Sequence, residues 1–112
     1  FNGKIKYIQV DVDRDTHHTR NFYNLNWELA NFSILYPKSS RTINRPQNLT
    51  TMINLVSLIA EDLSDRLSFV RIDFYDHNNE VYFGEITFHP DGGCGPISPI
   101  NYDIELGNEL VI

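Results

Sequence analysis

The residues of this sequence with the clearest chemical potential are two acids, Asp73 and Glu85, on a predicted β-hairpin. Residues 70–75 alternate between apolar and polar side chains, and so do residues 82–88. Residues 76–80 between them are polar and include two asparagines, which enter the left-handed region more readily than most residues. The pattern therefore predicts two antiparallel strands with one acid on each.

The register of this hairpin decides whether the two acids meet, because a slip of one residue turns every side chain to the other face. A two-residue turn at Asn78 and Asn79 would pair Asp73 with Gly84 and place Glu85 on the buried face. A three-residue turn that ends in a left-handed position pairs Asp73 with Glu85 and separates polar from apolar residues. We predict this second register. Its core face carries Val70, Ile72, Phe74, Tyr82, Ile86 and Phe88, and its polar face carries Arg71, Asp73, Tyr75, Phe83, Glu85 and Thr87.

Two carboxylates at about 5 Å between their Cβ atoms repel each other unless a positive group lies between them. Mg²⁺ takes oxygen ligands and usually binds one or two carboxylates together with substrate phosphates. Arg71 on the same face can hold a phosphate or a developing oxyanion with its planar fork. In the alternative interpretation, Arg71 neutralises Asp73, and a cation from a neighbouring strand neutralises Glu85. Hairpin geometry alone favours that alternative, because surface ion pairs are common.

The segment resembles the last metal-binding element of the ATP-grasp superfamily. In those enzymes an Arg-hydrophobic-Asp strand is followed by a strand with Glu, by a third oxygen ligand two residues later, and by a glycine-rich loop. The resemblance implies that Asp73, Glu85 and Thr87 are metal ligands and that Arg71 is catalytic. Thr87 stands where asparagine is usual, and a hydroxyl is a weaker metal ligand than an amide carbonyl.

A second resemblance covers nearly the whole chain. Its matching segments are 1–4, 8–14, 19–23, Trp27, 60–63, the hairpin and 102–107. In their order and spacing these segments resemble the TupA-like proteins, ATP-grasp proteins of bacterial teichuronopeptide, capsule and other cell-surface polysaccharide loci. The resemblance implies ATP and Mg²⁺ or Mn²⁺ as cofactors, and Arg14, Arg20 and Arg71 as cations that screen the phosphates.

Composition limits the functional classes. A chain of 112 residues, of which 41% are hydrophobic, forms one domain with a modest core. The net charge of −6 argues against nonspecific binding to nucleic acid or anionic membranes. No apolar run reaches the roughly 20 residues that span a bilayer. A single cysteine, Cys94, excludes an internal disulfide and fits a reducing compartment, so we expect a cytoplasmic protein. The resemblance to the TupA-like proteins implies an association with the membrane-bound polysaccharide assembly machinery.

Four further segments complete the predicted elements. Residues 4–12 have the alternation of a strand, whereas residues 13–20 form a charged loop in which His17 and His18 lack the further ligands of a zinc site. Residues 21–40 are irregular and rich in packing aromatics. A helix begins after Asn48, a good N-cap, and a second helix runs from about Ile100 to the end. The apolar stripe of the first helix contains Leu49, Met52, Ile53, Val56, Ile59, Ala60 and Leu63.

Together these features predict an α+β domain over residues 1–112, with a mostly antiparallel sheet packed with two helices. The resemblance makes it the C-terminal part of an ATP-grasp domain, because the phosphate-gripping lysine and the adenine-binding hinge of such enzymes cannot be identified here. The first residue, Phe1, agrees with a missing N-terminal half. The implied parent is an ADP-forming ligase that activates a carboxylate or a sugar-polymer substrate, and the isolated piece is expected to be inactive. The alternatives are a glycosyltransferase-like or accessory polysaccharide-assembly protein, and a noncatalytic interaction domain.

Overall fold

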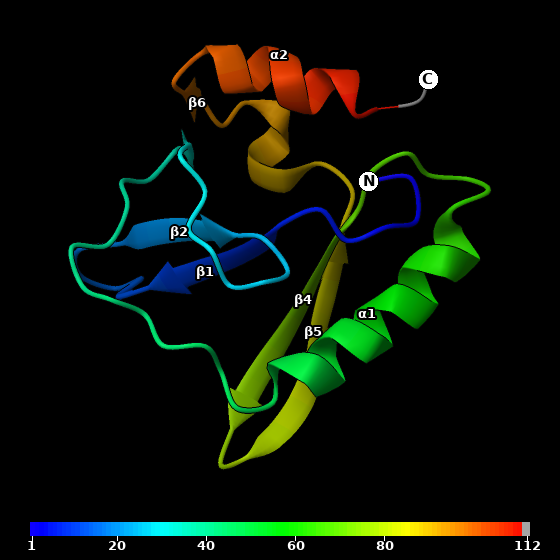
Figure 1. Ribbon diagram of the computed structural model, residues 1–112, viewed down its shortest axis with the longest axis horizontal. Coiled ribbons are helices and arrows are strands. Elements are labelled where there is room, and N and C mark those ends of the chain that lie inside the picture. The colour runs from blue at the N-terminus through cyan, green and yellow to red at the C-terminus, as the bar shows by residue number, and fades with distance from the viewer. Residues whose placement is uncertain (111–112) are drawn as a thin grey trace.

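The computed structural model describes residues 1–110 and has the predicted α+β class (Figure 1). Two helices and three pairs of strands make up the fold. In chain order the elements are β1 (Ile8–Val12), β2 (Thr19–Tyr23), β3 (Ser33–Ile34), α1 (Leu49–Leu63), β4 (Arg71–His77), β5 (Glu80–Thr87), a 3₁₀ turn (Pro90–Gly93), β6 (Ile97–Ser98) and α2 (Asn101–Asn108).

The strands form three separate antiparallel pairs, β1–β2, β3–β6 and β4–β5, instead of one larger sheet. The prediction of residues 13–20 as loop and 21–40 as irregular was wrong at β2, which pairs with β1 from Val12 opposite Thr19 to Ile8 opposite Tyr23. Four of the five β2 residues are buried, including two polar ones. A strand covered on both sides loses the alternation that marks a half-buried strand, so its sequence pattern is weak.

The β4–β5 hairpin pairs Asp73 with Glu85, as predicted, but it reaches this register by a different route. The turn has two residues, Asn78 and Asn79, and both are left-handed, with φ of 50° and 62°. The extra residue lies in β5, where Gly84 forms a bulge between the Asp73–Glu85 and Phe74–Phe83 pairs. The predicted three-residue turn was therefore wrong, although the pairing of the acids is confirmed.

The bulge also changes which residues share a face beyond it. Phe83 pairs with Phe74, and their rings meet edge to face at 5.8 Å between centroids. Tyr82 pairs with Tyr75 on the face of Asp73. The prediction had therefore placed Tyr82 and Phe83 on the wrong faces. Both residues lie between the bulge and the turn, so their faces depend on whether the extra residue is in the strand or in the turn.

Replacing Gly84 by alanine is expected to lower the free energy of unfolding by about 1 kcal/mol. A Cβ atom at this position would lie 2.6 Å from Cε2 of Tyr75 and 3.0 Å from the carbonyl oxygen of Asp73. The exposed Tyr75 ring can move away, but the backbone carbonyl must shift with the bulge. Urea denaturation measures the change.

Gly107 in α2 provides the matched control, because a Cβ atom there meets no atom within 4 Å. Gly107→Ala should stabilise the protein by about 0.5 to 1 kcal/mol, as alanine generally does in a helix. Equal effects of the two substitutions would contradict the tight bulge.

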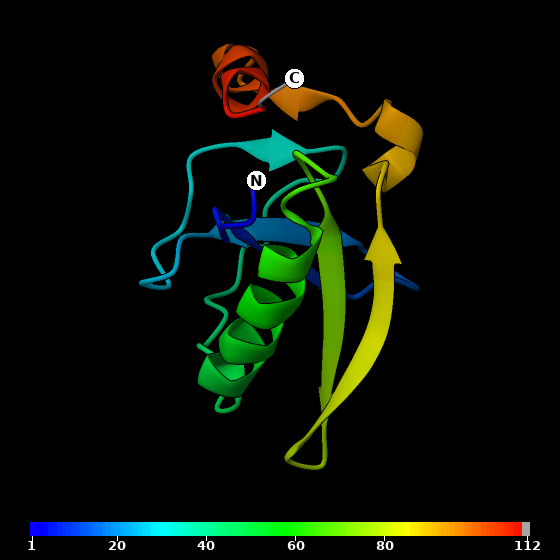
Figure 2. The same cartoon turned by 90° about the vertical axis from the view of Figure 1, so that its right-hand side faces the viewer.

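Helix α1 follows the predicted stripe, with Leu49 and Ala60 buried and the other stripe residues half-buried. Asn48 occupies the N-cap position, but the predicted side-chain cap is absent. Its Nδ2 instead donates to both carboxylate oxygens of Asp76 at 3.2 Å and to Oδ1 of Asn79 at 3.1 Å. Asn48 therefore ties the start of α1 to the turn of the hairpin, alongside which the helix runs (Figure 2).

The core is small and aromatic. Phe32, 1% exposed, contacts the rings of Tyr7, Phe22 and Tyr102 at centroid distances of 5.0, 4.8 and 5.2 Å. Tyr102 belongs to α2, so this cluster joins the β1–β2 hairpin to the predicted second helix. The helix ends at Asn108, so its predicted continuation was wrong at residues 109–110, and residues 111–112 lie outside the described residues. Neither helix among residues 1–110 has the length and apolar character needed to cross a membrane.

Candidate functional site

The hairpin brings four of the predicted site residues together. Arg71 donates from Nε and Nη2 to the two carboxylate oxygens of Asp73, at 2.9 and 3.1 Å. Its Nη2 also lies 3.3 Å from Oε1 of Glu85 and 3.4 Å from Oγ1 of Thr87. Thr87 donates to the same Glu85 oxygen at 3.2 Å. The guanidinium thus supplies the positive charge between the two acids.

The surroundings of Arg71 favour its protonated, charged form. Burial would lower its pKa, but the hydrogen bond and charge of Asp73 outweigh this effect and, with the charges of Asp91 and Glu85, raise the pKa. Asp73 is 23% exposed at its side chain, whereas Glu85 is 62% exposed. Glu85 is therefore the acid that can leave Arg71 most easily.

The donor set fits Mg²⁺ in its chemistry. No group of three or more His, Cys, Asp or Glu side chains within residues 1–110 is placed to hold a metal ion. Two facing carboxylates and a hydroxyl nevertheless match the partial oxygen site that Mg²⁺ completes with water and substrate phosphates. Such binding requires Arg71 to share or release carboxylate oxygens.

A second cluster surrounds Asp11 of β1. Nε of Arg20 donates to Oδ1 of Asp11 at 2.7 Å, and Nε2 of His18 lies 2.8 Å from the same oxygen. Oδ2 accepts from Gln9 at 2.7 Å and from Arg14 at 3.2 Å. Burial would raise the pKa of Asp11, but the hydrogen bonds from Arg20, Gln9 and His18 together lower it from 3.8 to about 2. Asp11 therefore stays ionised over the neutral pH range.

Arg20 links this cluster to the glycine-rich loop that follows β5. Its side chain is only 4% exposed, and its Nη1 donates to Oδ2 of Asp91 at 3.0 Å. Tyr36 lies beneath the guanidinium, 4.9 Å from ring centroid to Cζ, and stacks on His18 at 3.7 Å between ring centroids. In the predicted charged loop, His17 is exposed, whereas the side chain of His18 is only 15% exposed.

The two clusters meet at a polar cavity of about 260 Å³. All three predicted phosphate-binding arginines line it, together with two aromatic or imidazole rings and one acid from the loop. The lining residues are Arg14, His18, Arg20, Tyr36, Arg71 and Asp91. Residues far apart in the sequence therefore form one cationic site next to the acidic pair.

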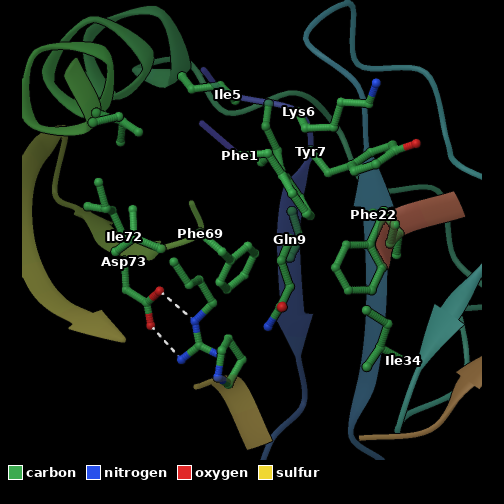
Figure 3. Close-up of a pocket in the computed structure, with 18 of the residues that line it drawn as sticks. Phe1, Ile5, Lys6, Tyr7, Gln9, Phe22, Ile34, Phe69, Ile72 and Asp73 are labelled. Atoms are coloured by element: carbon green, nitrogen blue, oxygen red, sulfur yellow. Dashed lines mark hydrogen bonds and ion pairs between the residues drawn. The ribbon is translucent and has the colours of Figure 1, made fainter. Parts of the chain in front are cut away.

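A much larger cavity of about 1080 Å³ adjoins this site between α1, β1 and β4. Its lining is mostly apolar, and Figure 3 shows Phe69 and Ile72 on the side of the hairpin and Tyr7 and Phe22 on the side of β1 and β2. Asp73 lies at its edge, with the hydrogen bonds to Arg71 dashed. Arg71 and Asp73 of the candidate site therefore border a mostly apolar space.

Sequence reasoning did not identify four residues of this site: Asp11, His18, Tyr36 and Asp91. Asp11 was predicted only as one of the polar residues in the alternating strand over residues 4–12. Its alternation with Gln9 and Asp13 gave the available signal, since a buried acid requires a cationic partner. Asp91 lies 71 residues from Arg20 in the sequence, so no local pattern marks their contact.

Comparison with known proteins supports one family. The family model described as TupA-like ATPgrasp matches residues 1–111. No curated protein and no solved structure matches the chain.

Proposed function

The chain belongs to the TupA-like ATPgrasp family, and from this premise we propose that it is the C-terminal, nucleotide- and Mg²⁺-binding part of an ATP-dependent ligase. The pairing of Asp73 with Glu85 beside Arg71 is the observation that carries the proposal. In the proposed reaction, a carboxylate attacks the γ-phosphate of ATP, ADP leaves, and an amine or similar nucleophile then displaces phosphate from the acyl phosphate.

Each of the site residues predicted from the sequence has a role in this reaction. Asp73 and Glu85 would hold Mg²⁺, with Thr87 beside them, and the ion would supply charge neutralisation between the phosphates when bound. Arg71 would turn from Glu85 towards the phosphoryl oxygens and stabilise the charge that develops on them. Arg14 and Arg20, which line the same polar cavity, would screen the remaining negative charge.

The setting we propose is the attachment of an amino acid or peptide to a cell-surface polymer, in the cytoplasm next to the polysaccharide assembly machinery. The phosphate-gripping lysine and the adenine-binding hinge would come from a preceding half of the same protein. The chain therefore supplies the metal and phosphate contacts, while activity requires both halves.

A Mn²⁺ titration monitored by NMR, with and without ATP, tests the proposal. Paramagnetic broadening should centre on Asp73, Glu85 and Thr87, and ATP should strengthen it. Asp73→Asn and Glu85→Gln should each weaken Mn²⁺ binding about tenfold, because each removes a charged oxygen ligand. The titration should be made on this chain and on the longer protein that contains it.

Glu80→Gln is the matched control, since Glu80 is an exposed acid at the other end of the same hairpin. It should leave Mn²⁺ binding unchanged. Equal effects of Glu80→Gln and Glu85→Gln would show nonspecific attraction to an acidic surface. If Mn²⁺ does not bind specifically to either protein, Asp73 and Glu85 are structural partners of Arg71, and the noncatalytic alternative is correct.

Nucleotide selectivity separates the ligase from the glycosyltransferase-like alternative. The ligase should bind Mn²⁺ more tightly with ATP than with a nucleotide sugar. The opposite preference would contradict the ligase assignment.

A further inference from the structure

We propose that the polar cavity binds a phosphoryl group and that the carboxylate of Asp91, on the glycine-rich loop, competes with that group for Arg20 and Arg71. The inference rests on the proposed function, because it takes the cavity arginines as ligands for phosphate oxygens. It adds that the Asp91 carboxylate competes with the phosphoryl group for the arginines and must move before that group binds.

The cavity is built as an anion site. Arg20, 4% exposed, is held by Asp11 and Asp91 through Nε and Nη1. Within the described part of the chain, its Nη2 makes no hydrogen bond and has donors to spare. Arg14 is 59% exposed, and Arg71 is 20% exposed. Guanidinium groups match the geometry of phosphate oxygens, and three of them suit a dianion better than a single carboxylate.

Asp91 is the acid that opposes such a ligand. Its backbone is exposed, yet its side chain is only 20% exposed because it points inward to Arg20. Its charge also acts on Arg71. A phosphoryl group in the cavity would meet this carboxylate as a like charge, next to Nη1 of Arg20. Asp91 therefore occupies one position that a ligand oxygen would take.

The loop is suited to releasing Asp91. Asp91, Gly92 and Gly93 are all left-handed, with φ of 54°, 63° and 76°. This region is unfavourable for a residue with a Cβ atom, so the ion pair with Arg20 helps to hold Asp91 there. A Cβ atom on Gly92 or Gly93 would meet nothing within 4 Å, so the loop is open at these two residues. Loss of the ion pair would remove the side-chain contact that holds Asp91 inward.

The test compares inorganic phosphate binding by wild type and Asp91→Asn, measured by NMR from the Nε–H signal of Arg20 and the amides of Gly92 and Gly93. Asparagine tolerates the left-handed region and keeps an oxygen for Arg20, so the fold should persist. Removal of the competing charge should tighten phosphate binding about fivefold to tenfold. Arg14→Gln, at an exposed side chain, should weaken it.

Asp62→Asn is the control for net charge, because Asp62 is an exposed acid of α1. It should leave phosphate binding unchanged, and equal tightening by Asp62→Asn and Asp91→Asn would overturn the inference. Phosphate binding that is unaffected by Asp91→Asn would also overturn the role of Asp91, while leaving the arginines as phosphate ligands. No phosphate binding by any variant would overturn both the inference and the phosphate contacts of the proposed function.

Addition of ATP with Mg²⁺ distinguishes two sources of the phosphoryl group, and either result supports the site. If ATP displaces phosphate from the cavity, the group belongs to the nucleotide. If both bind together, the cavity receives the phosphoryl group of the acyl phosphate.

Discussion

Replacing Asp11 by asparagine should lower the free energy of unfolding by about 2 to 3 kcal/mol at neutral pH. The side chain of Asp11 is 9% exposed, and its charge faces Arg20, which is 4% exposed. Removal of one partner from a buried ion pair leaves the other charge without compensation. Arg20 retains Asp91, so the expected cost is below that of a fully orphaned arginine. Urea denaturation measures the difference.

Asp13→Asn is the matched control, two residues along the same chain segment. Asp13 pairs with Arg41, but the two side chains are 47% and 67% exposed. An exposed pair contributes about 1 kcal/mol or less. If the two substitutions destabilise equally, Asp11 is not the centre of a buried network.

The same pair of proteins gives a pH dependence whose sign is fixed by the lowered pKa. Asp11 has a pKa of about 2 in the folded chain and an ordinary value of 3.8. The stabilisation by ionised Asp11 is complete above the ordinary pKa of 3.8 and is lost as the pH falls towards the folded-state pKa of about 2. The stability difference between wild type and Asp11→Asn should therefore shrink between about pH 5 and pH 2. A difference that stays constant would contradict the ionised network.

The hairpin illustrates how far the sequence alone predicts the site. The pairing of Asp73 with Glu85 follows from the need to separate charged from apolar side chains, and that need acts over only a few residues. The position of the extra residue that produces this register cannot be predicted in the same way. Asn78 and Asn79 suit more than one turn, and an extra residue in the turn or at Gly84 gives the same pairing of the acids. The packing of Phe83 against Phe74 and the pairing of Tyr82 with Tyr75 distinguish the two.

Strand β2 shows where local patterns fail. Arg20 and Asn21 are buried and polar, at 3% and 2% exposure. Arg20 is compensated by Asp11 and Asp91, while Asn21 donates to the Tyr23 hydroxyl and accepts from the backbone of Ser39. Hydropathy treats such residues as exposed because their partners lie elsewhere in the chain. Both the strand and half of the cationic cavity were therefore hidden from the sequence pattern.

Arg71→Gln should have opposite effects on Mn²⁺ affinity in the absence and in the presence of ATP. Without nucleotide, the affinity should rise about tenfold, because the guanidinium that donates to Asp73 and Glu85 no longer competes with the ion. Two unit charges near a protein surface at 4 Å interact by about 4 kcal/mol. Glu85 is 62% exposed, so solvent screens much of this energy, and about tenfold is the expected remainder.

With ATP present, the affinity of Arg71→Gln for Mn²⁺ should fall about tenfold below that of wild type. The phosphates would then bind Mn²⁺ and Arg71 together, and loss of the arginine removes a charge-assisted contact. Water proton relaxation, which reports bound Mn²⁺, measures both conditions. Arg66→Gln, at an exposed position after α1, removes the same charge and should change neither value.

The opposite signs distinguish a metal site from a structural ion pair. If Arg71 only neutralises the two acids, its removal exposes a repulsive pair that attracts any cation, and ATP should not reverse that gain. If Arg71 belongs to a nucleotide site, the same residue competes with the metal alone and cooperates with the metal–nucleotide complex. A gain in affinity under both conditions would therefore indicate a structural ion pair and would exclude Arg71 as a phosphate ligand.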